Sequence, residues 1–264
     1  MVTQQVTPPL TPQGAAPDRA PELLRVLTVN VHKGFSFLNR RFVLRELRDA
    51  VREVGADLVF LQEVHGTRAG AAGEFDRPHY EYLADQIWSD FAYGRNAVYT
   101  SGDHGNALLS KYPIESFENI DVSQARHEKR GLLYCTLRLP GRSQLLHTLC
   151  VHLGLKQLHR RRQVQRLCEF VAQRVPPGEP LLVAGDFNDW RGRAHRPLWQ
   201  CAQLAEVFAQ AQGRAERTFP ALLPLLRLDR IYARGVQRHL PLLLPARPWR
   251  SLSDHAPLAA EIVL

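Results

Sequence analysis

Polar side chains follow several short apolar runs in this chain, and their types suit phosphoester chemistry. Asp186 and Asn188 come directly after residues 181–184, whose pattern is that of a buried strand. Because the two residues are two positions apart, extended chain would turn both side chains to the same side. A carboxylate beside an amide can hold a hard cation, a water molecule or a phosphate oxygen. The sequence therefore predicts a polar site at this strand end.

Further predicted strand ends carry side chains of the same kinds, namely Asn30, Glu63, His152, Asp229, Asp254 and His255. Glu63 is a suitable oxygen ligand for Mg²⁺, and Asn30 adds a neutral oxygen donor. Neighbouring residues of a strand point to opposite faces, so Asp254 is a poor partner for His255. Asp229 is the candidate partner, and an Asp–His pair would fix the imidazole tautomer and raise its basicity.

These residue types together predict metal-assisted hydrolysis of a phosphoester. The Asp–His pair would activate water or stabilise the charge of the transition state, and His255 is expected to be partly exposed. Each residue taken singly also fits a cap, a surface carboxylate or a structural histidine, so the inference depends on their number. The Gly-x-Ser-x-Gly elbow and the phosphate-cradling Gly-x₄-Gly-Lys-Ser/Thr loop, which belong to other mechanisms, do not occur in the sequence.

Composition and cysteine usage restrict the class of protein. The chain has 264 residues, of which 45% are hydrophobic, a net charge of +8 and a sequence pI of about 9.7. Such charge favours a polyanionic partner, either nucleic acid or an anionic membrane surface. Lysine occurs at only four positions, however, and an arginine excess also follows from coding bias. The four cysteines form no Cys-x-x-Cys pair, which predicts buried, reduced thiols in a cytoplasmic protein.

Hydropathy patterning predicts which elements position these residues. Helices are expected over residues 42–54, 156–175 and 197–210, with a helix or a turn over 80–88. Strands are expected over residues 25–31, 57–61, 96–99, 107–110, 132–139, 145–153, 181–184, 228–233, 240–244 and 257–263. Pro241 and Pro245 place the strand over 240–244 at a sheet edge. This mixture favours helices packed over mostly antiparallel sheets.

Residues 1–24 are rich in Pro, Gln, Thr and Ala and carry no signal-peptide pattern. They are predicted to form a flexible N-terminal tail, which precedes one domain over residues 25–264.

The order of the polar strand ends resembles that of the endonuclease/exonuclease/phosphatase superfamily of DNase I-like enzymes. The matching segments are residues 27–30, 60–64, 105–110, 152–153, 185–188, 228–231 and 253–255. The resemblance implies a four-layered α/β/β/α sandwich, in which two mostly antiparallel sheets are flanked by helices and carry the site at one end. It also implies that Asn30, Glu63 and Asp254 surround a catalytic Mg²⁺ or Mn²⁺.

The resemblance implies roles for the other residues as well. Asp186 and Asn188 would position the attacking water and the phosphate, His152 and His255 would contact the scissile phosphate, and Asp229 would orient His255. Asn106 and Arg130 would bind substrate at the border of the cleft.

The substrate is less well defined than the chemistry. A phosphodiesterase or nuclease acting on nucleic acid is the first expectation. The alternative is a phosphodiesterase acting on phospholipid headgroups or other small phosphoesters, similar to sphingomyelinases or inositol phosphatases, with Phe35, Phe37 and Trp249 beside the site. A catalytically inactive binding relative is a third reading, against which the complete residue set argues. No obligate protein partner is inferred.

Departures from known branches narrow the resemblance. Val64 and His65 follow Glu63, where abasic-site endonucleases usually have Thr-Lys, which lowers the abasic-site reading. Residues 31–36 resemble uncharacterised bacterial members, whose motifs do not fix a substrate.

Overall fold

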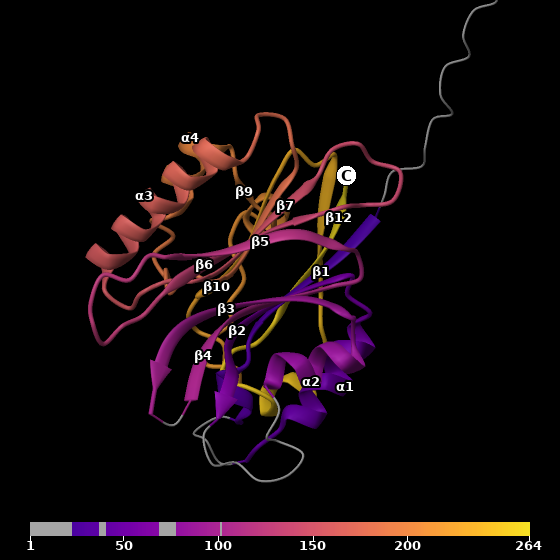
Figure 1. Cartoon of the computed structure of the whole chain (residues 1–264), viewed down its shortest axis with the longest axis vertical. Coiled ribbons are helices and arrows are strands. Elements are labelled where there is room, and N and C mark those ends of the chain that lie inside the picture. The colour runs from indigo at the N-terminus through magenta and orange to yellow at the C-terminus, as the bar shows by residue number, and fades with distance from the viewer. Residues whose placement is uncertain (1–22, 37–40, 69–77, 101) are drawn as a thin grey trace, which may run out of the picture.

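The computed structural model of the chain describes residues 23–36, 41–68, 78–100 and 102–264. Residues 1–22, which make up most of the predicted tail, and Phe37 lie outside the described residues. Two six-stranded sheets pack face to face between helices (Figure 1). The predicted α/β/β/α sandwich is therefore confirmed.

The first sheet has the spatial order β11-β12-β1-β2-β4-β3. Its strands are β1 (Leu23–Asn30), β2 (Leu58–Arg68), β3 (Asp90–Tyr99), β4 (Gly102–Ser110), β11 (Arg238–Leu242) and β12 (Leu258–Val263). β1 and β2 are parallel and are joined through α1 (Leu44–Val54), whereas the other described pairings of this sheet are antiparallel. Strand β11 lies at the sheet edge, as Pro241 predicts, because proline cannot donate to a ladder on both sides.

The second sheet has the spatial order β5-β6-β7-β8-β10-β9. Its strands are β5 (Ile114–Asp121), β6 (Gly131–Leu137), β7 (Leu146–His152), β8 (Leu181–Asp186), β9 (Ala205–Glu206) and β10 (Asp229–Arg234). β7 and β8 are parallel, and α3 (Gln157–Arg174) is the crossover that parallel neighbours require. Each sheet thus contains one β-α-β unit, which brings the carboxyl ends of two strands to the same edge.

Helices cover the outer faces of both sheets. In Figure 1, α1 and α2 (His79–Gln86) lie on the outer side of the first sheet, and α3 and α4 (His195–Ala202) lie on that of the second. A short helix, α5 (Val207–Gln212), and 3₁₀ turns at His32–Gly34 and Trp249–Ser251 complete the described elements. Helix α1 shows why these helices pack this way, because Leu44, Leu47 and Val51 are buried on one stripe and its other face is charged.

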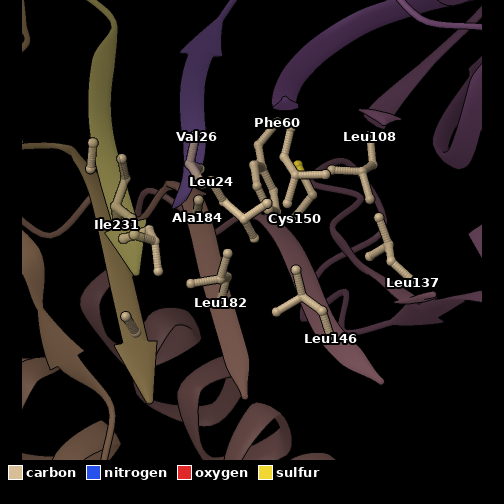
Figure 2. Packing of buried hydrophobic residues seen from close by; sticks show 14 of the residues in the cluster. Leu24, Val26, Phe60, Leu108, Leu137, Leu146, Cys150, Leu182, Ala184 and Ile231 are labelled. Carbon is tan, nitrogen blue, oxygen red and sulfur yellow. The ribbon is translucent and has the colours of Figure 1, made fainter. Parts of the chain in front are cut away.

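The main hydrophobic core lies between the sheets (Figure 2). Leu24, Val26 and Phe60 of the first sheet meet Leu182 and Ala184 of the second, and all are buried. Each sheet also has one outer hydrophobic cluster, which packs it against the helices that cover it. These three apolar layers hold the sheets in a fixed relation, so side chains at one end of both sheets can be brought together.

Several element boundaries differ from the predictions. Strand β1 begins at Leu23, two residues inside the predicted tail, and the buried Leu24 belongs to the core. The single helix predicted over 197–210 is two helices, because α4 ends at Ala202 and Gln203 adopts a left-handed conformation with φ of 53°. Strand β9 separates the two helices. Strand β5 was not predicted, because its pattern is mostly exposed and lacks apolar alternation.

Candidate active site

The polar strand ends of the second sheet lie side by side. His152 ends β7 and pairs in register with Asp186 at the end of β8, which in turn pairs with Asp229 at the start of β10. The first sheet adds Asn30 at the end of β1. The amide nitrogen of Asn30 lies 3.4 Å from Oδ2 of Asp186, so this contact joins the ends of the two sheets. Sequence-distant residues therefore meet at one place, as predicted.

Glu63 reaches this place through an irregularity in β2. The strand does not end at Glu63 but continues to Arg68, and its register with β4 shifts between Leu61 and Val64. Glu63 itself has a positive φ of 56°, which is uncommon for a residue with a long side chain. The bulge re-aims the carboxylate, and Oε1 lies 3.3 Å from the amide nitrogen of Asn30. Backbone strain of this kind gathers at functional sites.

The geometry around Asp186 corrects one inference from the sequence. Asn188 is not in extended chain, because its φ is 51°. The chain turns, so that the Asn188 backbone N–H donates to Oδ1 of Asp186 at 2.8 Å and its side-chain amide donates to the Leu153 carbonyl at 3.0 Å. Asp186 and Asn188 are therefore neighbours through a local turn, which asparagine tolerates well, and not through strand alternation.

His255 forms a buried pair with Asp229. Its Nδ1 lies 2.8 Å from Oδ2 of Asp229, and its Nε2 lies 3.9 Å from Oδ2 of Asp186. His255 is 6% exposed and Asp229 is 0% exposed, so the expectation of a partly exposed histidine was wrong. The ring of Phe219 packs against the imidazole, with 5.0 Å between the ring centroids, and helps to exclude water.

The charges around His255 favour its protonated form. Burial alone would lower the pKa of His255, but the charge and hydrogen bond of Asp229, together with Asp186 and Asp254, raise it to about 10. Burial raises the pKa of Asp186, and the charge of Asp229 raises it further against the opposing effect of His255. His255 thus provides an imidazolium, and the neighbouring Asp186 provides a carboxyl group that takes up a proton more readily than usual.

His152 is the neutral histidine of the site. Burial, with the positive charge of Arg130 as the next cause, lowers the pKa of His152 well below its ordinary value. Its Nε2 lies 3.5 Å from Oδ2 of Asp186 and 4.0 Å from Oε1 of Glu63. A neutral imidazole at this position can donate one hydrogen bond without adding charge.

Asp254 is held beside Asn30 by two contacts. The hydroxyl of Ser253 donates to the Asn30 carbonyl at 2.6 Å, which joins the 253–255 segment to the end of β1. Oδ2 of Asp254 lies 2.8 Å from Nδ1 of His32. Burial opposes ionisation of Asp254, but the hydrogen bond from His32 and the positive charges of His255 and His32 together outweigh it, so the pKa of Asp254 is lowered. Sequence reasoning missed His32, although it lies only two residues after Asn30.

Asn106 and Arg130 both donate hydrogen bonds to backbone carbonyls of the second sheet or of the residue after β7. Asn106 is fully buried, and its amide donates to the carbonyls of Gly131 and Cys150 at 3.0 and 3.2 Å, which ties β4 to the second sheet. Its Oδ1 is buried with no hydrogen-bond partner among the described residues. Arg130 donates through Nε to the Leu153 carbonyl at 3.2 Å. Their roles in substrate binding stay predictions.

Trp249 and Phe35 were expected to flank the site of a lipid-cleaving enzyme. Trp249 is 4% exposed and packs in the core beneath the first sheet, so it does not present an apolar surface. Phe35 is half-buried against Phe42, with 5.4 Å between the ring centroids.

The cysteines also differ from expectation. Cys135 and Cys150 are buried free thiols, as predicted. Cys168 of α3 and Cys201 of α4 instead form a disulfide with 5.7 Å between their Cα atoms. Sequence spacing could not reveal the pair, because 33 residues separate the two cysteines and only helix packing brings them together. The disulfide borders a cavity of about 650 Å³ between α3 and α4.

The donor atoms at the sheet ends fit a divalent cation. Ligand atoms of Asp186, Asp229 and His255 all lie within 4.8 Å of one another, and Glu63 and Asp254 add two carboxylates beside them. The side chains of Glu63 and Asp254 are 23% and 17% exposed, so an ion arriving from solvent can reach them. Carboxylate and amide oxygens suit Mg²⁺ or Mn²⁺ better than softer metals. The two more accessible carboxylates and Asn30 are the residues that would hold such an ion.

Comparisons with solved structures identify the same architecture in other proteins. An endonuclease/exonuclease/phosphatase from Beutenbergia cavernae superimposes with a TM-score of 0.72 at 18% identity, over 92% of this chain and 72% of the other. A truncated TDP2 from Caenorhabditis elegans superimposes with a TM-score of 0.67 at 18% identity, over 92% and 98% of the two chains. At these identities the likeness shows the fold alone.

Sequence comparison is more specific. The uncharacterized protein YbhP of Escherichia coli (strain K12) is 56% identical over 253 residues, which are 94% of this chain and 100% of YbhP. Among the described residues, no helix is long and apolar enough to cross a bilayer. The family model of the Endonuclease/Exonuclease/phosphatase family matches residues 27–255, a span that holds every site residue described above. This chain therefore belongs to the endonuclease/exonuclease/phosphatase family.

Proposed function

We propose that this protein is a divalent-metal-dependent hydrolase of phosphodiesters. The observation that carries the proposal is the position of His255, whose two ring nitrogens lie between Asp229 at 2.8 Å and Asp186 at 3.9 Å. A buried imidazolium next to a carboxyl group with a raised pKa provides a positive hydrogen-bond donor and a proton acceptor at one place. Both groups accelerate phosphoester hydrolysis.

The chain supplies the ligands that such a reaction needs. Asn30, Glu63 and Asp254 would hold Mg²⁺ or Mn²⁺, and the bound ion would neutralise phosphate charge and favour departure of the leaving oxygen. Asn30 also positions the site, because its amide donates to Glu63 at 3.3 Å and to Asp186 at 3.4 Å.

Each remaining residue has a role that its environment supports. Asp186 accepts a proton from the attacking water, because burial raises the pKa of its carboxyl group towards neutrality. Asn188, held by the turn at Asp186, orients this water or a phosphate oxygen. His255 donates from Nε2 to the phosphate and offsets the charge that develops there, while Asp229 fixes its ring. Neutral His152 donates a further hydrogen bond.

The experiment that tests this proposal is hydrolysis of the soluble diester bis(4-nitrophenyl) phosphate by the purified full chain. We expect turnover with Mg²⁺ or Mn²⁺ and loss of turnover after Asp186→Asn. Turnover by the variant equal to that of the unchanged protein would remove Asp186 from the mechanism. Absence of turnover with any divalent metal, on this diester and on a panel of nucleic acids and phospholipids, would favour an inactive binding relative.

The natural diester is a separate question. The net charge of +8 is compatible with nucleic acid and equally with an anionic membrane surface. Nucleic acid was the first expectation from the sequence, and it stays a prediction that the same panel tests.

The cellular location also stays a prediction. The sequence favoured the cytoplasm, whereas a disulfide such as Cys168–Cys201 persists more often in oxidising compartments. Thiol trapping in intact cells separates the two. Labelling of Cys168 and Cys201 without a reductant would favour the cytoplasm.

A further inference from the structure

A loop next to the active site presents four leucines to solvent. Leu222, Leu223, Leu225 and Leu226 are 52%, 66%, 54% and 39% exposed. A single exposed leucine is ordinary, but four within five residues make a contiguous apolar surface, and such surfaces mark interaction sites. We call residues 220–227 the leucine loop.

Backbone hydrogen bonds fix the shape of the leucine loop. The N–H groups of Leu225 and Leu226 both donate to the Phe219 carbonyl at 2.8 Å, and the Leu223 N–H donates to the Pro220 carbonyl at 3.1 Å. The Thr218 N–H donates back to the Leu226 carbonyl at 2.8 Å. The leucines are therefore held outward by a closed turn.

The leucine loop is joined directly to the catalytic segment. The Ala221 N–H donates to the Asp254 carbonyl at 2.7 Å, and the Ala256 N–H donates to the Thr218 carbonyl at 2.7 Å. Phe219, which begins the turn, packs its ring on His255. Whatever binds the exposed leucines therefore lies beside the residues that would contact the phosphate.

Arginines surround the leucine loop. Arg214 and Arg217 are exposed, and Arg227 lies within the loop. Burial lowers the pKa of Arg227, and the charges of Arg217 and Arg214 lower it further, so the three cations are close enough to repel one another. Glu216 is the neighbouring acid, which leaves the group with a net positive charge. An anionic partner would relieve this repulsion.

A groove extends the same surface. A cavity of about 280 Å³ separates the leucine loop from residues 242–250, and its lining includes Arg217, Ala221, Pro224, Leu243, Pro245 and Arg250. Leu243 on its far side is 87% exposed, and Arg247 and Arg250 are exposed nearby. Apolar and cationic side chains thus line both sides of the groove, with Glu216 as the acid among the lining residues.

We propose that the leucine loop and residues 242–250 form a membrane-binding surface that places the active site on an anionic phospholipid bilayer, so that the diester it hydrolyses belongs to a lipid headgroup. This inference rests on the proposed phosphodiester hydrolysis for the reaction, but the membrane contact stands on its own. Leucines enter the apolar region of a bilayer, and arginines bind its headgroup phosphates. Nucleic acid fits less well, because leucine side chains neither stack on bases as aromatic rings do nor bind phosphate.

The test is co-sedimentation of the full chain with vesicles of phosphatidylcholine and phosphatidylglycerol in equal parts, compared with vesicles of phosphatidylcholine alone. We expect binding to the anionic vesicles and a loss of about tenfold or more in Leu222→Ser/Leu223→Ser, because two inserted side chains are removed. Arg214→Gln/Arg217→Gln should lose about 25-fold, since each cation near an anionic surface is worth roughly a fivefold factor.

Matched controls come from elsewhere on the surface. Trp199→Ser removes an apolar side chain of α4 that is 55% exposed, and Arg161→Gln/Arg162→Gln removes two exposed cations of α3. Both controls should bind vesicles as the unchanged protein does, and melting temperatures check that every variant is folded. Equal vesicle binding by the leucine variant and the unchanged protein would overturn the inference.

Other occupants give distinct results. If the leucine and arginine variants lose binding to duplex or single-stranded DNA while the unchanged protein ignores vesicles, the surface binds nucleic acid and the inference is wrong. If the unchanged protein dimerises and Leu222→Ser/Leu223→Ser makes it monomeric without vesicle binding, a second copy is the occupant. If the protein hydrolyses the soluble diester but binds no vesicles, the proposed reaction holds and the membrane-binding surface is wrong. If it binds vesicles but hydrolyses no diester, the membrane-binding surface holds and the proposed reaction is wrong.

Discussion

Nδ1 of His255 lies 2.8 Å from Oδ2 of Asp229, and both side chains are buried at the end of the second sheet. The other carboxylate oxygen of Asp229 is buried with no hydrogen-bond partner among the described residues. The imidazolium is thus the principal compensation for a buried negative charge, and the same contact holds the imidazole ring in place.

Removing one member of this pair should destabilise the fold. His255→Ala leaves the carboxylate of Asp229 buried without its cation, which typically costs about 3–5 kcal/mol of the free energy of unfolding. Asp229→Asn/His255→Gln removes both charges and should recover most of that loss, yet remain inactive. Urea unfolding and diester turnover measure the two properties. A fully stable His255→Ala would show that water replaces the imidazole.

Asp229→Asn alone should preserve the shape of the site and still lose most of its activity. Without the carboxylate the pKa of His255 falls from its raised value and the ring is free to adopt the wrong tautomer. We expect kcat to fall by roughly 10³- to 10⁴-fold with KM little changed. Steady-state kinetics check this. A large rise in KM with kcat unchanged would assign Asp229 to substrate binding.

Chelation should abolish activity. We expect EDTA to remove diester turnover and Mg²⁺ or Mn²⁺ to restore it, because Glu63 and Asp254 provide the carboxylates for the ion. The metal should also raise the melting temperature, since an ion that binds only folded protein stabilises it. Asp254→Asn should lose the metal-induced shift, whereas Glu115→Gln, on the exposed edge strand β5, should keep it. Undiminished turnover in chelator contradicts the metal mechanism.

The positive φ of Glu63 predicts a trade between stability and function. A left-handed backbone costs a residue with a side chain about 1–2 kcal/mol, and glycine avoids this cost. Without metal, Glu63→Gly should therefore unfold with a free energy about 1 kcal/mol higher than that of Glu63→Ala. Both variants should lose metal-dependent turnover. Equal stability of the two variants would mean that the bulge is relaxed.

The disulfide should stabilise the fold without taking part in the reaction. Cys168→Ser/Cys201→Ser should lower the free energy of unfolding by about 4 kcal/mol, because the bridge joins cysteines 33 residues apart and so closes a long loop in the unfolded chain. Turnover should change little, since the bridge joins α3 to α4 outside the second sheet. Thiol titration should find no reactive thiol in the folded protein and two after unfolding without a reductant, because burial raises the pKa of Cys150 to about 12 and that of Cys135 as well.

Glu206 should make the stability depend on pH. Burial raises the pKa of Glu206 to about 7 although it accepts a hydrogen bond from the Ala209 N–H at the start of α5. The folded state therefore keeps a proton on Glu206 that the unfolded state releases near pH 4.5. The stability that protonated Glu206 contributes to folding is fully present at acid pH and is lost as pH rises from about 4.5 to 7. Between pH 5 and pH 8 the unchanged protein should lose about 2–3 kcal/mol more stability than Glu206→Gln does. Urea unfolding measures the free energy of unfolding at each pH. An equal change in this free energy between pH 5 and pH 8 in the two proteins would contradict the prediction.

The sequence alone determined the order of the candidate site residues and the class of fold. Apolar runs of strand length that end in Asn30, His152 and Asp186 are local patterns, and hydropathy reveals them without any long-range contact. The pairing of Asp229 with His255 followed from excluding the adjacent Asp254, and the structure contains this contact. The edge position of β11 followed from Pro241 in the same way.

Only the tertiary structure decided the rest, because it depends on contacts between distant segments. The bulge at Glu63, the turn at Asn188 and the end of α4 at Gln203 all require a positive φ, which the hydropathy pattern does not reveal. The burial of His255, the disulfide between α3 and α4, and the joining of the leucine loop to Asp254 arise from packing across tens of residues. The local sequence pattern therefore determines which polar side chains the candidate site can contain. Packing between distant segments determines their protonation, their backbone strain and the surface that surrounds them.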